Sequence, residues 1–340
     1  MRMKSGFAAV LSLVVAIFVF AACGSDDSGT STAGGGSKSA DGAKFGAIVL
    51  TKQGEFYLAY ERAMKAVAEE AGADLTLLDS DTRVEKQQEN MESLLTNGTN
   101  AIALSPVDAA SAVPLIKQAD GQGAKVVTVT TPAEGAPVVV EDALAAGREG
   151  GVAAAKYFQK EYPGTPINIA IVGFPQLQQT VDRAEGFVAG VRSVDPRAKV
   201  VVNQDGGAVL DKATTAAENM LQAHPEANLW FGINDDSALG ALNALKGAGR
   251  GTVDKKELVV GFDGSAKAIQ ELLNPRSALK VEVGNEPRSY AELAFDAMVK
   301  LNDGDTVQER NVVPVTLLTS EMSEAELRDY YRTQWSAELP

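Results

Sequence analysis

The sequence predicts an α/β protein built from two doubly wound parallel sheets, and two observations support this fold class. From Lys44 onward, short apolar runs alternate with amphipathic stretches, and most of the runs are continuous rather than alternating in polarity. Continuous apolar runs are typical of parallel strands that helices cover on both faces. About ten such runs are present, and that number is better divided between two sheets than placed in one.

The expected strands and helices alternate at the spacing of βαβ units. The strands are Phe45–Leu50, Leu75–Leu78, Ala101–Leu104, Lys125–Val129, Ile167–Val172, Lys199–Val202, Leu229–Ile233, Leu258–Phe262 and Leu279–Val283. The helices include Tyr57–Ala71, Val84–Leu95, Ala109–Ala119, Ala213–Leu221 and Ala238–Leu245. Near the C-terminus, Ser323 and Glu326 precede Leu327 in the spacing of a capping box, which predicts a short terminal helix.

The N-terminus has the pattern of a secretory signal. Arg2 and Lys4 precede an apolar run at residues 7–22, which ends in Phe20-Ala21-Ala22-Cys23. A basic start, an apolar middle and small residues before a cleavage point characterise such signals. The alternative is an uncleaved anchor helix, but a span needs about 20 apolar residues. The ending resembles a bacterial lipobox, so we expect residues 1–22 to be removed and Cys23 to be lipidated.

Residues 23–43 are expected to form a flexible tether behind the lipid anchor. The segment is rich in Gly and Ser and carries no large apolar side chain, so it cannot bury a core of its own. More than one acyl chain is needed for lasting membrane attachment, and a lipidated N-terminal cysteine supplies them. We therefore expect an exported protein, anchored to the outer face of the cytoplasmic membrane in the cell envelope or periplasm.

Composition argues against several functional classes. The 340-residue chain has a formal net charge of −14, whereas a nucleic-acid partner requires a basic surface. Metal sites and nucleophilic triads draw on Cys and His, and the chain has one of each, Cys23 and His224. No motif for nucleotide, zinc, calcium or acyl-transfer chemistry occurs. We expect no cofactor, no metal and no enzymatic activity.

Polar residues follow the expected strands, at the edge where open α/β sheets bind their ligands. The pool comprises Thr51-Lys52-Gln53, Asp79-Ser80, Ser105-Pro106, Thr130-Thr131, Gly173-Phe174, Gln204-Asp205, Asn234-Asp235-Asp236, Phe262-Asp263 and Gly284-Asn285-Glu286. Amides, hydroxyls and carboxylates pair with ligand hydroxyls, while the nearby rings of Phe56 and Tyr57 offer apolar faces. The pattern indicates a sugar or polyol pocket.

Three motifs, in this order, resemble the ribose-binding-protein-like family of periplasmic binding proteins. They are Arg183-Ala184-Glu185-Gly186-Phe187, Asn234-Asp235-Asp236-Ser237-Ala238-Leu239-Gly240-Ala241 and Val259-Val260-Gly261-Phe262-Asp263-Gly264. The resemblance covers roughly residues 44–320. It implies a monomeric, non-enzymatic receptor that binds a small polar ligand between two lobes and passes it to an ABC permease. A sensory receptor that presents its closed form to a chemoreceptor or histidine kinase is the alternative.

The resemblance also implies the type I arrangement, in which the chain crosses between the lobes three times. The crossings are expected near residues 138–140, 285–286 and 314–316. The first lobe would then hold residues 44–138 and 286–315, and the second lobe residues 139–285 and 316–340.

The same resemblance assigns roles to individual residues. Arg183, Asn234 and Asp263 are expected to bond ligand hydroxyls, Asn285 to do so from the hinge side, and Phe56 and Phe262 to stack on the sugar ring. Gln53, Thr130, Thr131 and Asp236 complete the expected ligand-binding set. Substitution of Arg183 or Asp263 should weaken binding and barely affect folding. The alternatives are that the two phenylalanines belong to the core, that Arg183 is ion-paired, and that Asn234, Asp236 and Asp263 cap helices.

Two departures from the family pattern bear on the ligand. The first loop reads Gln53-Gly54-Glu55-Phe56-Tyr57, where the family often has Asn before the aromatic residues. Thr130-Thr131-Pro132 stands where ribose- and galactose-type members carry a charged pair. Because neutral threonines cannot replace that pair, we expect a polyol, a deoxy or modified sugar or another small polar molecule rather than D-ribose or D-glucose. Lys52, Gln53 and Glu55 are the groups that could restore the lost contacts.

The lipobox interpretation is tested by replacing the acceptor thiol. Cys23→Ser should release the protein from membranes or leave an uncleaved precursor, because serine offers no sulfur for acylation. Membrane fractionation and mass spectrometry of the mature terminus provide the measurement. An unlipidated mature N-terminus in the wild-type protein would rule the anchor out.

Overall fold

The computed structural model describes residues 42–340, and these contain two six-stranded sheets. The first sheet has the order β11-β5-β4-β3-β1-β2, and all its strand pairs are parallel. Its strands are β1 (Lys44–Val49), β2 (Asp74–Asp79), β3 (Ala101–Leu104), β4 (Lys125–Val129), β5 (Val138–Glu141) and β11 (Arg310–Val313). The predicted two-sheet α/β class is confirmed.

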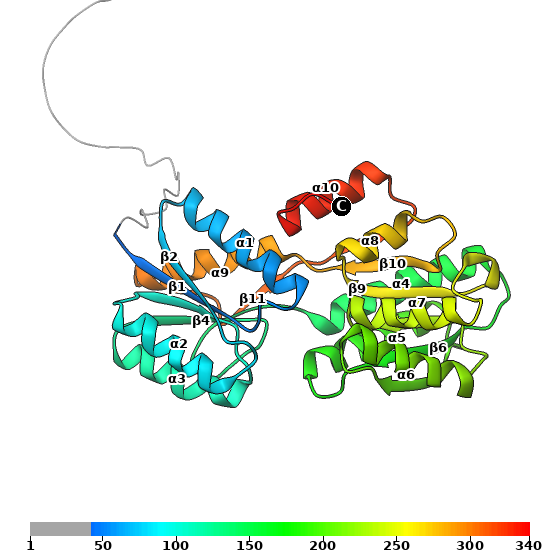
Figure 1. Cartoon of the computed structure of the whole chain (residues 1–340), viewed down its shortest axis with the longest axis horizontal. Helices are drawn as coiled ribbons and strands as arrows, with labels where there is room; N and C mark the ends of the chain where they lie inside the picture. The colour runs from blue at the N-terminus through cyan, green and yellow to red at the C-terminus, as the bar shows by residue number, and fades with distance from the viewer. Residues whose placement is uncertain (1–41) are drawn as a thin grey trace, which may run out of the picture. The chain divides into compact units, whose positions relative to one another are not determined.

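Helices cover both faces of the first sheet, as the continuous apolar strands require. The helices are α1 (Glu55–Glu70), α2 (Val84–Thr96), α3 (Ala109–Gly121) and α9 (Pro287–Asn302). Helices α1 and α9 pack on each other and bury one apolar cluster with the strands, while α2 and α3 bury another on the opposite face (Figure 1). The sheet is therefore not complete until α9 and β11, far along the chain, have joined it.

The second sheet has the order β12-β10-β9-β8-β6-β7, and only its edge strand β12 runs antiparallel. Its strands are β6 (Asn168–Gly173), β7 (Lys199–Asp205), β8 (Leu229–Gly232), β9 (Leu258–Asp263), β10 (Leu279–Gly284) and β12 (Thr316–Thr319). Its helices are α4 (Ala143–Glu161), α5 (Gln178–Val194), α6 (Leu210–Ala223), α7 (Asp235–Gly247), α8 (Ala266–Leu273) and α10 (Glu324–Trp335), with a short 3₁₀ turn at Val253–Lys255.

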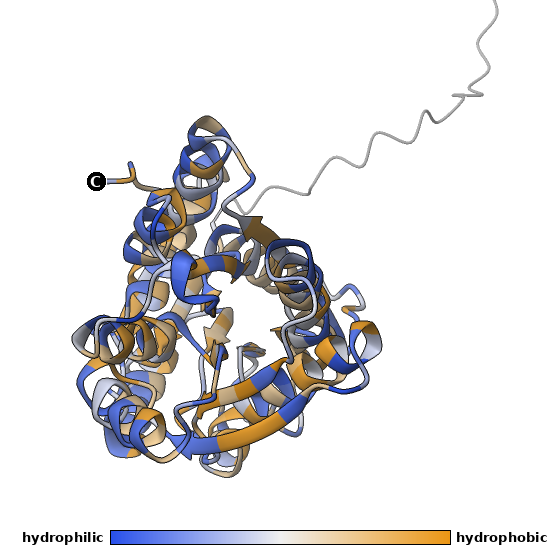
Figure 2. Ribbon diagram, turned by 90° about the vertical axis from the view of Figure 1, so that its right-hand side faces the viewer, coloured by the Kyte–Doolittle hydropathy of each residue, from blue (hydrophilic) through white to orange (hydrophobic). Residues whose placement is uncertain are grey.

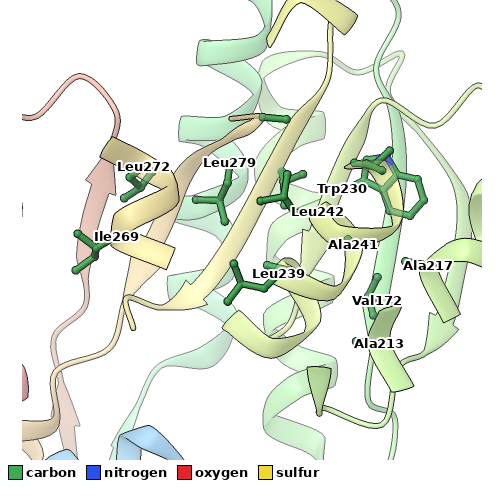
Figure 3. Close-up of a cluster of buried hydrophobic side chains, with 14 of the residues drawn as sticks. Val172, Ala213, Ala217, Trp230, Leu239, Ala241, Leu242, Ile269, Leu272 and Leu279 are labelled. Atoms are coloured by element: carbon green, nitrogen blue, oxygen red, sulfur yellow. The ribbon is translucent and has the colours of Figure 1, made fainter. Parts of the chain in front are cut away.

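Two apolar clusters hold the second sheet between its helices. Helices α4 and α5 pack on one face, around Phe187 and Phe231, whose rings stack 4.1 Å apart. On the other face, Trp230 and Leu279 meet Leu239, Leu242 and residues of α8 (Figure 3). The hydropathy colouring shows the matching amphipathic stripes along the helices (Figure 2).

The chain passes between the two sheets after β5, after β10 and between β11 and β12. Strand β5 pairs with β4 and β11 along Val138–Glu141, so the first sheet extends three residues beyond the expected boundary at 138. The apolar run ends in Glu141, which the strand pairing places in the first sheet. The second passage follows β10, which ends at Gly284, and the third lies between Val313 of β11 and Thr316 of β12. Assignment of the two sheets to separate lobes stays a prediction.

Helix α10 begins as the capping box predicted. Ser323 accepts from the Glu326 amide, and the Glu326 carboxylate accepts from the Ser323 amide. The signal peptide, Cys23 and nearly all of the tether lie outside the described residues. Within residues 42–340, no helix has the length and apolarity to cross a membrane.

Helices α4 and α5 approach each other closely at four glycines. A Cβ atom added to Gly147 or Gly151 would lie 2.1 Å from a carbonyl oxygen of α5. Added to Gly186 or Gly190, it would lie 2.1 or 2.2 Å from a carbonyl oxygen of α4. Both pairs are spaced four residues apart, so each places two glycines on the same helix face. This contact fixes the backbone of α5, which carries Arg183.

Because of this contact, replacing one of the four glycines with alanine should destabilise the protein, although alanine has the higher helix propensity. Gly186→Ala should lower the free energy of unfolding by about 1–3 kcal/mol, since the methyl group would overlap the Leu144 carbonyl. The matched control is Gly247→Ala at the end of α7, where an added Cβ meets no atom within 4 Å. That change should be neutral or slightly stabilising. Denaturant unfolding measures both, and equal stabilities of the Gly186 variant and the wild type would contradict the contact.

Candidate functional site

A buried ion pair joins the end of β5 to helix α5. Nε and Nη2 of Arg183 donate to Oε1 of Glu141 at 2.8 and 2.6 Å, and Nη1 donates to the Ile233 carbonyl at 2.9 Å. The side chains of Arg183 and Glu141 are only 7% and 0% exposed. Burial alone would lower the pKa of Arg183, but the charges of Glu141 and Asp263 raise it. The guanidinium is therefore charged and held in one orientation.

Tyr290 and Phe56 extend this network across the first sheet's helices. The Tyr290 hydroxyl donates to Oε2 of Glu141 at 2.6 Å and accepts from the Glu141 amide at 3.0 Å. Burial and the Glu141 charge raise the pKa of Tyr290, so the hydroxyl keeps its proton. The Phe56 ring meets the Tyr290 ring edge-on, with centroids 5.3 Å apart. Phe56 is half-buried and packs against the core of the first sheet.

Phe262 lies beneath the Arg183 guanidinium. The guanidinium carbon is 3.7 Å from the ring centroid, which is the geometry of a cation–π contact. Phe262 is fully buried within the core on the α4 and α5 side of the second sheet. The core role that the sequence left open is therefore present, and one face of the ring is occupied by Arg183.

Asp263 and Asn285 end neighbouring strands and bond each other. The Asn285 amide donates to the Asp263 carbonyl at 2.8 Å, and its side-chain Nδ2 donates to Oδ1 of Asp263 at 3.4 Å. Oδ1 also lies 3.8 Å from Nη1 of Arg183. Asp263 has a φ of 131°, a strained value for a residue other than glycine. Strain of this kind persists only where neighbouring contacts hold the backbone.

Further carboxyl groups lie below Asp263. Glu282 is fully buried and neither of its carboxyl oxygens has a hydrogen-bond partner, whereas Oδ2 of Asp235 accepts from the Ser265 amide. Burial raises the pKa of both carboxyl groups, and the negative charge of Asp235 raises that of Glu282 further. Burial raises the pKa of Asp263 to about 8, with Arg183 opposing the shift and Asp235 and Glu141 adding to it. The surroundings therefore resist further negative charge.

Thr130 and Tyr57 meet on the side of the first sheet. Thr130 is buried and has a φ of 66°, and its hydroxyl donates to the Val129 carbonyl at 2.6 Å. The Tyr57 and Thr130 hydroxyls lie 3.3 Å apart. Burial raises the pKa of Tyr57, the Thr130 contact lowers it, and the charges of Glu141 and Asp263 raise it further. The carboxylates that raise the pKa of Tyr57 therefore belong to both sheets, Glu141 to the first and Asp263 to the second. Thr131 is half-buried next to this pair.

Three other expected ligand residues form no hydrogen bond or ion pair with the side chains of this network. Asn234 caps α7, where its Oδ1 accepts from the Ser237 amide and its Nδ2 donates to the Ala208 carbonyl. Asp236 is exposed in the first turn of α7, and partial desolvation raises its pKa. Gln53 is exposed and donates to Asp81 at 3.1 Å. Their ligand roles stay predictions.

Two residues of the network, Glu141 and Tyr290, are absent from the ligand set that the sequence predicts. Glu141 directly ends an apolar strand, so the rule that gathered the other strand-end residues would have found it. Tyr290 lies within α9, and no local pattern distinguishes it from a core residue. Neither Tyr57 nor Tyr290 was in the expected ligand-binding set, although Tyr57 was noted beside Phe56.

Two cavities on the second sheet's side do not include the expected ligand residues. One of about 490 Å³ lies along α5, β6 and β7, and is lined by Phe174 and Val188 among others. Another of about 550 Å³ is lined by residues that include Tyr157, Lys280 and Met322. Within residues 42–340, no three His, Cys, Asp or Glu side chains group in a way that would hold a metal ion.

The architecture places the protein in a known class. Two mainly parallel sheets, interleaved with helices and joined by three chain passages, form the type I periplasmic binding protein fold. Residues 45–306 match the model of the family described as "Periplasmic binding protein domain", and the chain belongs to that family.

Individual relatives agree with this assignment. The ribose import binding protein RbsB of Bacillus subtilis is 28% identical over 274 residues, which are 81% of this chain and 86% of the relative. An ABC transporter solute-binding protein from Mycobacterium smegmatis, solved with bound glycerol, is 30% identical with a TM-score of 0.73, covering 84% of this chain and 96% of that one. A binding protein from Actinobacillus succinogenes, solved with D-allose, has a TM-score of 0.75 at 20% identity, covering 82% and 98%, and shows the fold alone. The protein is a substrate-binding protein of the ABC transporter type and not an enzyme.

The expectation that Arg183 can be removed without affecting folding is wrong, because its guanidinium is buried and paired. Arg183→Ala should lower the free energy of unfolding by about 3–5 kcal/mol, since it leaves Glu141 buried without its partner. The matched control is Arg192→Ala, an exposed position on the same helix, which should change stability little. Denaturant unfolding measures the free energy of unfolding of both variants. Equal losses in the two would show that the ion pair with Glu141 makes Arg183 no more important for stability than Arg192.

Proposed function

We propose that the protein is the lipid-anchored, sugar- or polyol-binding component of an ABC importer. The ligand lies between two lobes, each built on one sheet, and the loaded protein delivers it to a membrane permease. Hinge bending at the three chain passages closes the lobes on the ligand. The lipobox at Cys23 and the tether at residues 23–43 keep the protein near its permease.

One observation carries this proposal: polar and aromatic groups from both sheets form one continuous contact network. It runs from Phe56 through Tyr290 and Glu141 to Arg183, and on to Asp263 and Asn285. Charged groups, an amide and rings in one place are the set that recognises hydroxyl-rich ligands. The ribose import relative and the glycerol-bound relative support a ligand of this kind.

The charge balance of the network favours a neutral ligand. Glu141 already neutralises Arg183, and Asp263, Asp235 and Glu282 add three more carboxyl groups. The surroundings that raise the pKa of Asp263 would oppose an anionic ligand for the same reason. Thr130 adds no charge, and its hydroxyl is already bonded to a backbone carbonyl. We therefore favour neutral polyols and deoxy or modified sugars over sugar acids, sugar phosphates, D-ribose and D-glucose.

Calorimetry with a fixed set of compounds tests the ligand class. The set contains myo-inositol, D-allose, D-ribose and D-glucose as neutral compounds, and D-glucuronate and D-ribose 5-phosphate as anions. At least one neutral compound should bind, and the anions should bind at least about tenfold more weakly than it does. Asp263→Ala should weaken binding of that neutral compound by about one to two orders of magnitude, because a ligand hydroxyl buried at this position would lose its hydrogen-bond partner.

Three outcomes count against parts of the proposal. Tighter binding of an anion than of every neutral compound would overturn the charge argument. Sub-micromolar binding of D-ribose or D-glucose would overturn the preference against those sugars. Unchanged affinity in the Asp263 variant would remove that residue from the ligand site.

A further inference from the structure

The C-terminal helix reaches the candidate ligand site through one hydroxyl group. The Tyr330 hydroxyl donates to the carbonyl of Asn285 at 2.5 Å, and it lies 3.5 Å from the carbonyl of Asp263. Tyr330 belongs to α10, and Asn285 follows the end of β10, where the chain leaves the second sheet. The two carbonyls belong to the two residues whose side chains meet in the network.

Two glycines leave room for this approach. A Cβ atom at Gly284 would lie 2.5 Å from the Tyr330 hydroxyl oxygen and 2.8 Å from Cζ. A Cβ atom at Gly264 would lie 3.1 Å from the same hydroxyl and from Cε1 of the ring. Gly284 does not have a positive φ, so its lack of a side chain is explained by the close approach and not by backbone conformation. The tyrosine therefore occupies a slot formed by residues adjoining Asp263 and Asn285.

Helix α10 is anchored firmly enough to act as a support. Leu327, Tyr331 and Trp335 are buried in the core of the second sheet, and the rings of Tyr331 and Trp335 stack 5.6 Å apart. The same helix also contacts α1 and α9 of the first sheet (Figure 1). There, Arg62 donates to the Trp335 carbonyl at 2.9 Å.

We propose that Tyr330 is a positioning residue for the ligand site: its hydroxyl fixes the backbone at Asn285 and thereby holds the strained Asp263 in place. This inference rests on the proposed function, because it takes Asp263 and Asn285 as ligand groups. The Asn285 amide bonds the Asp263 carbonyl, so a fixed Asn285 also fixes its neighbour. Burial raises the pKa of Tyr330 well above its usual value, so the hydroxyl remains a donor throughout the physiological pH range.

The test compares Tyr330→Phe with Tyr331→Phe in the full chain. The first variant keeps the ring and removes only the hydroxyl, and the second makes the same change one residue along the same helix. Amide hydrogen exchange of Asn285 should become about threefold to tenfold faster in Tyr330→Phe and remain unchanged in Tyr331→Phe. In the calorimetric set, the neutral compound that binds the wild type should bind Tyr330→Phe about threefold to tenfold more weakly.

A second variant reaches the same contact from the other side. Gly284→Ala should displace the Tyr330 hydroxyl and raise Asn285 exchange by at least as much as Tyr330→Phe does. The double variant should show less than the sum of the two effects, because both act on one interaction.

The outcomes separate this inference from the proposed function. If no neutral compound binds the wild type, the proposed function fails, and the exchange measurement alone decides whether Tyr330 holds Asn285. Unchanged Asn285 exchange in Tyr330→Phe would overturn the inference. It would also be overturned if Tyr330→Phe matched the wild type in both measurements while Tyr330→Ala did not, because the ring and not the hydroxyl would then be responsible.

Discussion

The buried pair between Glu141 and Arg183 is the interaction on which the site depends. It joins the last residue of β5 to helix α5, so it connects the first sheet to the second where the chain first passes between them. Desolvation of both charges offsets much of the attraction, and such a pair contributes orientation more than stability. Tyr290 bonds Glu141 and Asp263 lies near Arg183, so the pair links the polar groups on its two sides. The pair also places the guanidinium over Phe262 and near Asp263.

The surrounding acidity follows from that arrangement. Once Glu141 has neutralised the guanidinium, little positive charge remains for Asp263, and within residues 42–340 neither Asp235 nor Glu282 forms an ion pair. Burial raises the pKa of all three carboxyl groups. A hydroxyl-rich molecule suits such surroundings because a hydroxyl group both donates and accepts hydrogen bonds. The raised pKa values and the proposed preference for a neutral ligand both follow from burial and from the pairing of Arg183 with Glu141.

Much of the fold could be read from the sequence because apolar runs report burial directly. The nine strand candidates match strands of the two sheets, and the capping box at Ser323 marks the start of α10. The expected boundary between the lobes, at residue 138, falls within β5. The sheet to which a strand belongs is decided by the strands that pair with it, here β4 and β11, and not by its own residues. Strand β11 is a short edge strand of mixed polarity and has no comparable signal.

The sequence predicts only part of the candidate site, and the reason differs from residue to residue. Arg183, Asp263 and Asn285 stand in family motifs or directly after strands, and the structure brings them together. Asn234 fits both a ligand role and a helix cap, and in the structure its side chain makes the cap. Tyr290 and Tyr330 act from helices through single hydroxyl groups. Such contacts depend on tertiary placement, which no residue spacing along the chain records.

The late arrival of α9 and β11 in the first sheet has a consequence for how the chain folds. Residues 42–141 supply five of its six strands, but the apolar face under α9 stays uncovered until residues 287–302 are available. All strands of the second sheet except β12 lie in the intervening segment. A chain that emerges N-terminus first on the far side of a membrane must therefore carry a half-covered sheet while most of the second sheet forms. Contacts of such large sequence separation slow folding, and exposed apolar surface during that interval favours aggregation. The interwoven chain thus makes folding of the newly exported protein depend on residues 287–340.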